Sequence, residues 1–374
     1  MSPNLNMEVK SMRTRKWPIA LTALGVLLVV AVFIVSFVVT PAITKLPSDT
    51  DRTAVLSGTM QVPDPTNPTA MVSRPVEVER TIKSEKVAGN DALVSVTTRA
   101  FSVPRSESEK PLSETSLNFG IDRKRYGQSD APGGGEVTDQ QGASVFAFPK
   151  DPARDGQTFY DTTLAKAVPL TYEGNKDISG RENLTFKASN TGPVGDQALA
   201  GRLYAALGQR FGTDGKSIPA VVLAKMGVPE AILKQFGPSL PVSLVATSDV
   251  TIDADKNLGL FTALEQGVKV VAAIGDSTKP LTRMPLQILN VSANDDTVAD
   301  TIATLKDAES MLRALTLWIP LALGVLGLIL IVGAAVLWRR GSGAAPDSSN
   351  ESTDSTNSKA GVEPSIRRPR AACS

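Results

Sequence analysis

The chain has 374 residues and a nearly balanced charge, with 39 Lys and Arg against 38 Asp and Glu and a formal net charge of +1. This balance, without a basic patch interleaved with aromatic residues, argues against nucleic-acid binding. Histidine is absent and the single cysteine, Cys373, lies next to the C-terminal residue, so Ser-His-Asp catalysis, Cys-His catalysis and most zinc chemistry are excluded. We therefore expect a non-enzymatic protein without a cofactor or metal.

Two uncharged apolar runs, 18–39 and 314–338, lie near opposite ends of the chain. Each exceeds the roughly 20 residues that a membrane-spanning helix needs. The first run is also longer than the apolar core of a cleaved signal peptide and lacks an A-x-A-like cleavage site, so we expect an uncleaved anchor. Lys and Arg flank both runs, in a basic arm at 1–17 and in a tail at 339–374 whose Ser/Asn/Gly/Pro-rich composition predicts disorder.

The positive-inside rule then places both termini in the cytoplasm and residues 40–313 outside the inner (plasma) membrane. We predict an α+β fold for the chain, with a β-rich exterior (periplasmic) domain that carries a helical insertion and is flanked by two transmembrane helices. Alternating and β-branched patterns predict strands at 53–62, 76–82, 92–103, 117–122, 145–148, 242–252, 267–274 and 284–291. A further strand pair, 159–173 and 178–189, is predicted around a turn at 174–177.

Helical spacing replaces this pattern in two places. Within the insertion at 197–236, apolar residues four apart predict an amphipathic helix over 197–211. A juxtamembrane helix is predicted over 295–313, with Asn294-Asp295-Asp296 able to cap its start. Nothing interrupts that helix before Pro320, so we expect it to continue into the second apolar run.

One candidate ligand-binding segment is the aliphatic stretch 218–236. It is interpreted either as ordinary core packing or as a wall for the acyl chains of a lipid. Its candidate binding residues are Val221, Val222, Leu223, Met226, Ile232, Leu233 and Phe236.

A second candidate is the block from Phe159 to Thr163, which combines aromatic side chains with a carboxylate and hydroxyls that suit sugars or headgroups. The alternative is that its polar residues only shape a turn. The candidate residues are Phe159, Tyr160, Asp161, Thr162 and Thr163. Elsewhere, Asp253-Ala254-Asp255 evokes a calcium loop but lacks its bidentate Glu, so we interpret it as a solvated turn.

Several short blocks together resemble an actinobacterial family of two-span exported proteins that is often labelled "porin PorA family". They are Leu56-Ser57-Gly58-Thr59, Gly120-Ile121-Asp122-Arg123-Lys124, Phe146-Ala147-Phe148-Pro149, Phe159–Leu164, Ala167-Val168-Pro169 and Tyr172-Glu173-Gly174. The resemblance implies a role in the cell envelope, since members have been linked to lipomannan maturation and lipoarabinomannan synthesis through a periplasmic domain that holds acylated intermediates. The chain departs from the family pattern at 251–261, where members often carry an aromatic-rich turn.

The leading hypothesis is thus a membrane-anchored envelope protein that binds a phospholipid or an acylated glycolipid and assists lipomannan/lipoarabinomannan-type assembly. The alternative is a structural scaffold subunit for an envelope glycosyltransferase or transporter. We do not expect the chain itself to form a pore, because porins cross the membrane with strands closed into a barrel and carry no long apolar helices.

Overall fold

The computed structural model describes residues 5–36, 45–64, 66–67, 70–106, 109–276 and 279–342. Its chain divides into two units, one formed by Met1–Val30 with Leu323–Ser374 and the other by Ala31–Ala322, and each is described by itself. The predicted disorder of the tail concerns residues that, from 343 onward, lie outside the described part of the chain.

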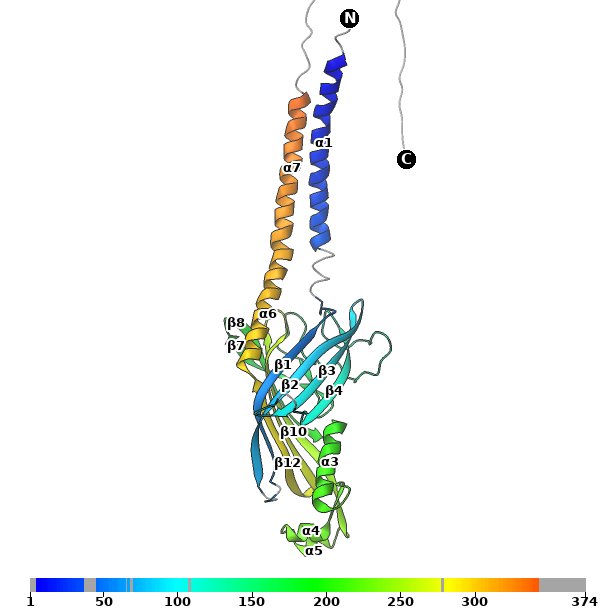
Figure 1. The fold of residues 1–374 in the computed structure, drawn as a ribbon, viewed down its shortest axis with the longest axis vertical. Helices are drawn as coiled ribbons and strands as arrows, with labels where there is room; N and C mark the ends of the chain where they lie inside the picture. Colours follow the sequence, from blue (N-terminus) through cyan, green and yellow to red (C-terminus); the bar gives the residue numbers. More distant parts are fainter. Residues whose placement is uncertain are drawn as a thin grey trace, which may run out of the picture. The chain divides into compact units, whose positions relative to one another are not determined.

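The helical unit contains most of α1 (Leu5–Ile34) and α7 (Ile319–Ser342). These helices approach each other closely at two glycines: a Cβ added to Gly25 would lie 2.7 Å from Ile331 Cγ1 and 2.9 Å from the carbonyl oxygen of Gly327. Small residues allow such close backbone approach between apolar helices. Figure 1 shows the two helices side by side.

Within the described residues, one helix is long and apolar enough to cross a membrane, the 45-residue segment Asp295–Arg339. It contains the whole second apolar run and supports that predicted span. In α1 the apolar helical part, Ile19–Ile34, is shorter. Residues 37–39 of the first predicted span lie outside the described residues, so that span stays a prediction.

The β domain is built on one long antiparallel sheet in the order β4-β3-β2-β1-β12-β11-β10-β8-β7 (Figure 1). Its strands are β1 (Asp51–Pro63), β2 (Met71–Ala88), β3 (Asp91–Ser102), β4 (Ser113–Asp122), β7 (Thr171–Ile178), β8 (Arg181–Pro193), β10 (Ser239–Asp255), β11 (Phe261–Gly275) and β12 (Pro280–Ala293). β9 (Ser217–Pro219) pairs with β10, and β5 (Thr158–Asp161) pairs with β6 (Lys166–Pro169) in a separate sheet. The pairing of β1 with β12 joins the first four strands to the rest.

Alternating sequence gives the sheet one apolar face and one polar face. Along β10 the even-numbered residues are buried in the main core cluster, among them Leu240, Val242, Leu244, Val250 and Ile252. The odd-numbered residues from Pro241 to Thr251 are exposed or partly exposed. The β-rich fold is therefore confirmed, and most predicted strands are found as parts of longer ones.

Three strand predictions are wrong. The segment 159–173 is not one strand, because it contains most of β5, a turn at 162–165, β6 and the start of β7. Residues 145–148 form no strand and contribute only an isolated bridge between Ala147 and Leu260. The turn between β7 and β8 lies at Ser179–Gly180, where φ is 51° and 79°, and not at 174–177. Two successive residues with positive φ suit a tight hairpin, whereas Gly174, at φ 145°, accompanies a bulge inside β7.

The helical insertion is found as α3 (Gln197–Phe211), α4 (Ala220–Lys225) and α5 (Glu230–Leu233). α3 has the predicted bounds because both of its ends are capped. The Asp196 carboxylate accepts hydrogen bonds from the backbone N–H groups of Ala198 and Leu199, and Gly212 ends the helix at φ 67°. Figure 1 shows α4 and α5 at the end of the β domain far from α6.

The juxtamembrane helix α6 (Asp295–Arg313) starts at Asn294, whose side chain accepts a 2.8 Å hydrogen bond from Thr297 N. It continues through a π-helical segment, Ala314–Trp318, directly into α7. Pro320 follows this segment closely. Proline lacks an N–H and clashes with the carbonyl four residues earlier, and a widened π turn relieves that conflict without ending the helix. The predicted continuity into the second apolar run is confirmed.

One buried hydroxyl in the sheet core has no partner. Ser248 on β10 is 1% exposed, and its Oγ makes no hydrogen bond within the described residues. A buried donor left unpaired costs about 1–3 kcal/mol. We expect Ser248→Ala to raise the free energy of unfolding by about 1 kcal/mol, measured by urea denaturation followed by far-UV circular dichroism. The control Ser95→Ala removes an exposed hydroxyl that is bonded to Glu85, and it should change the free energy of unfolding by less than about 0.5 kcal/mol. A lower free energy of unfolding for Ser248→Ala would contradict the prediction.

Candidate binding groove and the contact between sheet and helix

A polar groove crosses the middle of the sheet on the face opposite the main core. It consists of two adjoining cavities of about 420 Å³ and 320 Å³, which share Thr251, Glu265 and Ser292 as lining residues. These three lie in one row across neighbouring strands, since Thr251 is paired with Glu265 and Glu265 with Ser292. The strand register therefore builds the shared floor of the groove.

The next row of the sheet widens the second cavity. Asp249, Gly267, Asn290 and Thr59 are successive partners on β10, β11, β12 and β1. A Cβ on Gly267 would lie 3.2 Å from Asn290 Oδ1 and 3.7 Å from Asp249 Cβ. Because glycine leaves this space open, the side chains of its two neighbours border a hollow.

The charge of the groove is mainly negative. Asp249 and Glu265 are exposed and form no ion pair with any described residue. Asp253 in the first cavity is different: its carboxylate is buried, lies 2.7 Å from Lys176 Nζ and accepts a 2.6 Å hydrogen bond from Thr185. Unpaired carboxylates, amides and hydroxyls on one open surface suit a ligand that offers many hydroxyl donors, and they disfavour an anionic one.

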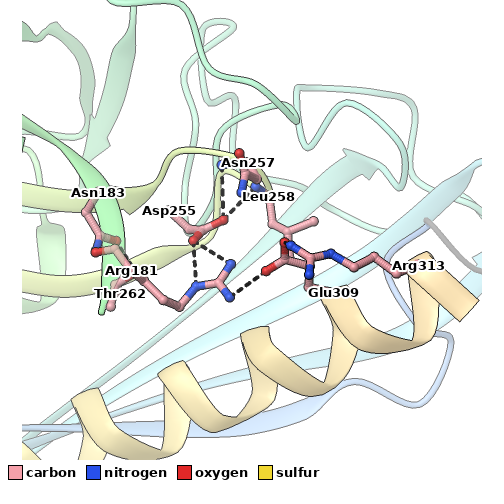
Figure 2. Close-up of polar contacts among 8 residues, drawn as sticks. All are labelled: Arg181, Asn183, Asp255, Asn257, Leu258, Thr262, Glu309 and Arg313. Carbon is pink, nitrogen blue, oxygen red and sulfur yellow. Dashed lines mark hydrogen bonds and ion pairs between the residues drawn. The ribbon is translucent and has the colours of Figure 1, made fainter. Parts of the chain in front are cut away.

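Beside the first cavity, a buried ion-pair network joins the sheet to α6, as Figure 2 shows. Arg181 on β8 is 8% exposed and donates to Asp255 from Nε at 2.9 Å and from Nη2 at 2.8 Å. Its Nη1 donates to Glu309 of α6 at 2.8 Å, and Glu309 also pairs with Arg313 at 2.7 Å. One guanidinium thus links the end of β10 to the helix that continues into the second apolar run.

Further hydrogen bonds hold the Asp255 end of this network, and the network shifts the pKa of two of its members. The other oxygen of Asp255 accepts from the backbone N–H groups of Asn257 and Leu258 (Figure 2). The hydrogen bond from Arg181 lowers the pKa of Glu309 below its usual range. Burial alone would lower the pKa of Arg181, but its hydrogen bonds to Asp255 and Glu309 raise it. The interpretation of Asp253 and Asp255 as a solvated turn is therefore wrong, because both carboxylates are buried and paired.

The candidate block at Phe159–Thr163 lies in the interior and lines neither cavity. Phe159, Tyr160, Asp161 and Thr163 are all buried, and Thr162 is partly buried. Asp161 Oδ1 accepts hydrogen bonds from the backbone N–H groups of Thr163 and of the residue after it, at 2.9 and 3.0 Å. The structure thus gives Asp161 the turn-shaping role that the sequence left as an alternative, and ligand binding by the block stays a prediction.

The aliphatic candidates at 221–236 are divided between core and surface. Leu223 and Leu233 are buried in the main core cluster, and Val222 and Ile232 are partly buried. The other three are exposed, with Val221 at 67%, Met226 at 43% and Phe236 at 45%. None of the seven lines either cavity of the groove. The groove has no signature in the sequence, because single Asp, Asn, Ser and Thr residues on alternating strand positions give no motif; only the strand register brings them together.

A β-rich domain whose last helix continues into an apolar helix long enough to cross a membrane indicates a membrane-associated protein. The chain belongs to the Porin PorA family, whose model matches residues 17–336. No curated protein matches it. One solved structure, an N-terminal dehydratase from the difficidin assembly line, is 9% identical to this chain. The match covers 68% of this chain and 82% of the dehydratase chain, with a TM-score of 0.13.

Proposed function

We propose that the chain is a non-enzymatic, membrane-anchored envelope protein whose β domain binds the glycan part of a lipid-linked sugar and assists lipomannan/lipoarabinomannan-type assembly. In this proposal both termini face the cytoplasm and the β domain lies outside the inner membrane. The polar groove is the observation that carries it. Its lining of carboxylates, amides and hydroxyls offers many acceptors to sugar hydroxyls, and its unpaired Asp249 and Glu265 disfavour a phosphate in the same place.

We expect the β domain to contact the sugar part of the ligand and not its acyl chains. The two cavities of the groove contain none of the aliphatic residues from 221–236. We therefore propose that the acyl part of the ligand stays in the bilayer and the glycan lies along the sheet. The neighbouring helix α6, through Val298, borders the first cavity.

The proposal is tested by isothermal titration calorimetry of the full-length protein in a non-ionic detergent. The probes are an α-linked manno-oligosaccharide and the same glycan linked to phosphatidylinositol. We expect both to bind, and we expect Glu265→Gln to raise the dissociation constant about tenfold, since a hydrogen bond to a charged group contributes about 1.5–3 kcal/mol. Glu136→Gln, an exposed Glu outside the groove, is the matched control and should leave binding unchanged.

Absence of binding by both probes, or equal binding by Glu265→Gln and the unchanged chain, would overturn the proposal. The scaffold alternative has a separate result: a glycosyltransferase or transporter would co-purify with the protein whether or not the groove is altered. Conductance steps in planar bilayers containing only the purified protein would instead favour the pore function that the family's description names.

A further inference from the structure

The opposite face of the sheet holds a cation, Arg80, that has no counter-ion among the residues that the structure describes. Arg80 on β2 points to the core side, on the same face as Val76 and Val78, which are buried. Its Nη2 donates a 3.0 Å hydrogen bond to the carbonyl oxygen of Val145. A guanidinium has five N–H donors, and this is the one hydrogen bond that Arg80 makes with the described residues.

The surroundings of Arg80 are unusual for a cation. The segment that covers it includes Ala143, Val145 and Ala147, all at most 1% exposed. Arg80 forms no ion pair with any residue in the described ranges, and burial alone lowers its pKa to about 10. A guanidinium has five N–H donors and Arg80 uses one of them on the described chain, so the others are available for an anion.

A second arginine lies beside the first on the same face. In the pairing of β1 with β2, Arg80 is opposite Ala54, and Arg52 is opposite Ile82. The two arginines are therefore diagonal neighbours, a separation that long side chains can bridge. Arg52 is exposed and also forms no ion pair within the described part of the chain. Arg80 itself is only partly buried, so solvent species reach this place.

We propose that Arg80, with Arg52 beside it, forms an oxyanion-binding site for a phosphate group between β2 and the segment 143–148. A guanidinium binds phosphate oxygens through two parallel hydrogen bonds, and the anion supplies the negative charge that no carboxylate of the described chain provides. The phosphate belongs either to free inorganic phosphate or to a lipid headgroup. This site lies on the other sheet face from the polar groove and is independent of the proposed glycan binding.

The test uses the full-length protein in a non-ionic detergent and follows its melting temperature in two arms. The first arm adds inorganic phosphate, with sodium chloride at equal ionic strength to remove screening effects. The second adds mixed micelles of phosphatidic acid or, for comparison, of a neutral-headgroup lipid. A ligand that binds the folded state raises the melting temperature, so we expect a rise with phosphate or with phosphatidic acid beyond that of its control. The arm that responds identifies the source of the phosphate.

Arg80→Met should abolish this rise or weaken the apparent affinity at least about tenfold, and Arg80→Lys should keep part of it. Arg202→Met, which removes an exposed arginine of α3, is the matched control and should respond as the unchanged chain does. If Arg80→Met does not fold, the comparison is made with Arg80→Lys and with ³¹P line broadening of phosphate by the unchanged protein. No response of the unchanged chain in either arm, or an undiminished response in Arg80→Met, would refute the site.

Discussion

Replacing Arg181 by methionine should lower the free energy of unfolding of the β domain by about 3–5 kcal/mol, the usual cost of removing one partner of a buried ion pair. The cost is large because Asp255 is 1% exposed and would be left without its cation. The measurement is urea denaturation of the full-length protein in detergent, followed by far-UV circular dichroism of the sheet. Arg313→Ala, which removes an outer member that is 72% exposed, should change stability by less than about 1 kcal/mol.

A double variant measures the energetic coupling between Arg181 and Asp255. Arg181→Met combined with Asp255→Asn should be less damaging than the sum of the two single changes, because no buried charge then stays unpaired. Additive losses would contradict the coupling described for the network. Such a result would mean that Arg181 acts through packing alone.

The same network predicts a pH dependence. The folded-state pKa of Glu309 is lowered, chiefly by its hydrogen bond from Arg181. A carboxylate with a depressed folded pKa stabilises the fold above its unfolded value of about 4.3, and this contribution is lost as pH falls through the folded pKa. The stability difference between the unchanged chain and Glu309→Gln should therefore shrink as the pH is lowered below about 4. A difference that stays constant over this range would exclude an ionic contribution of Glu309.

Gly58→Ala is expected to cost the β domain about 3 kcal/mol or more, the upper range for overpacking a closely packed site. A Cβ at this position would lie 1.9 Å from the carbonyl oxygen of Asn290 and 2.8 Å from Val291 Cα. Both obstacles are backbone atoms, which cannot move away as a flexible side chain can. β1 and β12 would have to separate at the one pairing that joins the first four strands to the rest of the sheet.

A second glycine provides the matched control. Gly201 lies in the exposed part of α3, and a Cβ added there would meet nothing within 4 Å. Gly201→Ala should therefore raise the free energy of unfolding by about 0.5–1 kcal/mol, because alanine is the better helix former. Thermal and urea denaturation would measure both variants. Equal effects of the two substitutions would show that the close contact at Gly58 is not what limits stability.

The elements with a strong local signal were predicted well. α3 was predicted with its bounds, since its apolar spacing lies within the segment and its caps, Asp196 and Gly212, directly adjoin it. The start of α6 at Asn294 followed in the same way from a short capping sequence. The hairpin between β7 and β8 was misplaced because Gly174 looks like a turn residue, and only the pairing shows that it accompanies a bulge.

The candidate site was predicted poorly for a related reason. The aromatic block with Asp161 stood out as a motif, yet its hydrogen bonds serve the local turn. The residues that line the groove come from β1, β7, β10, β11, β12 and α6, and they lie far apart in the chain: Ser57 and Ser292, which are paired, are 235 positions apart. No local pattern marks such residues, since their common feature is the strand register.

The sequence by itself determined the apolar runs, the β-rich class of the part between them, the helical insertion and the unbroken helix into the second run. These properties depend on composition and on periodicities of 2 and 3.6 residues, which are local. Only the tertiary structure decided that Asp255 faces Arg181, that Glu309 completes the contact with α6, and that Arg80 lies by segment 143–148 without a counter-ion among the described residues. Those facts depend on which distant strands pair and in which register, and long-range pairing is a property of the whole folded chain.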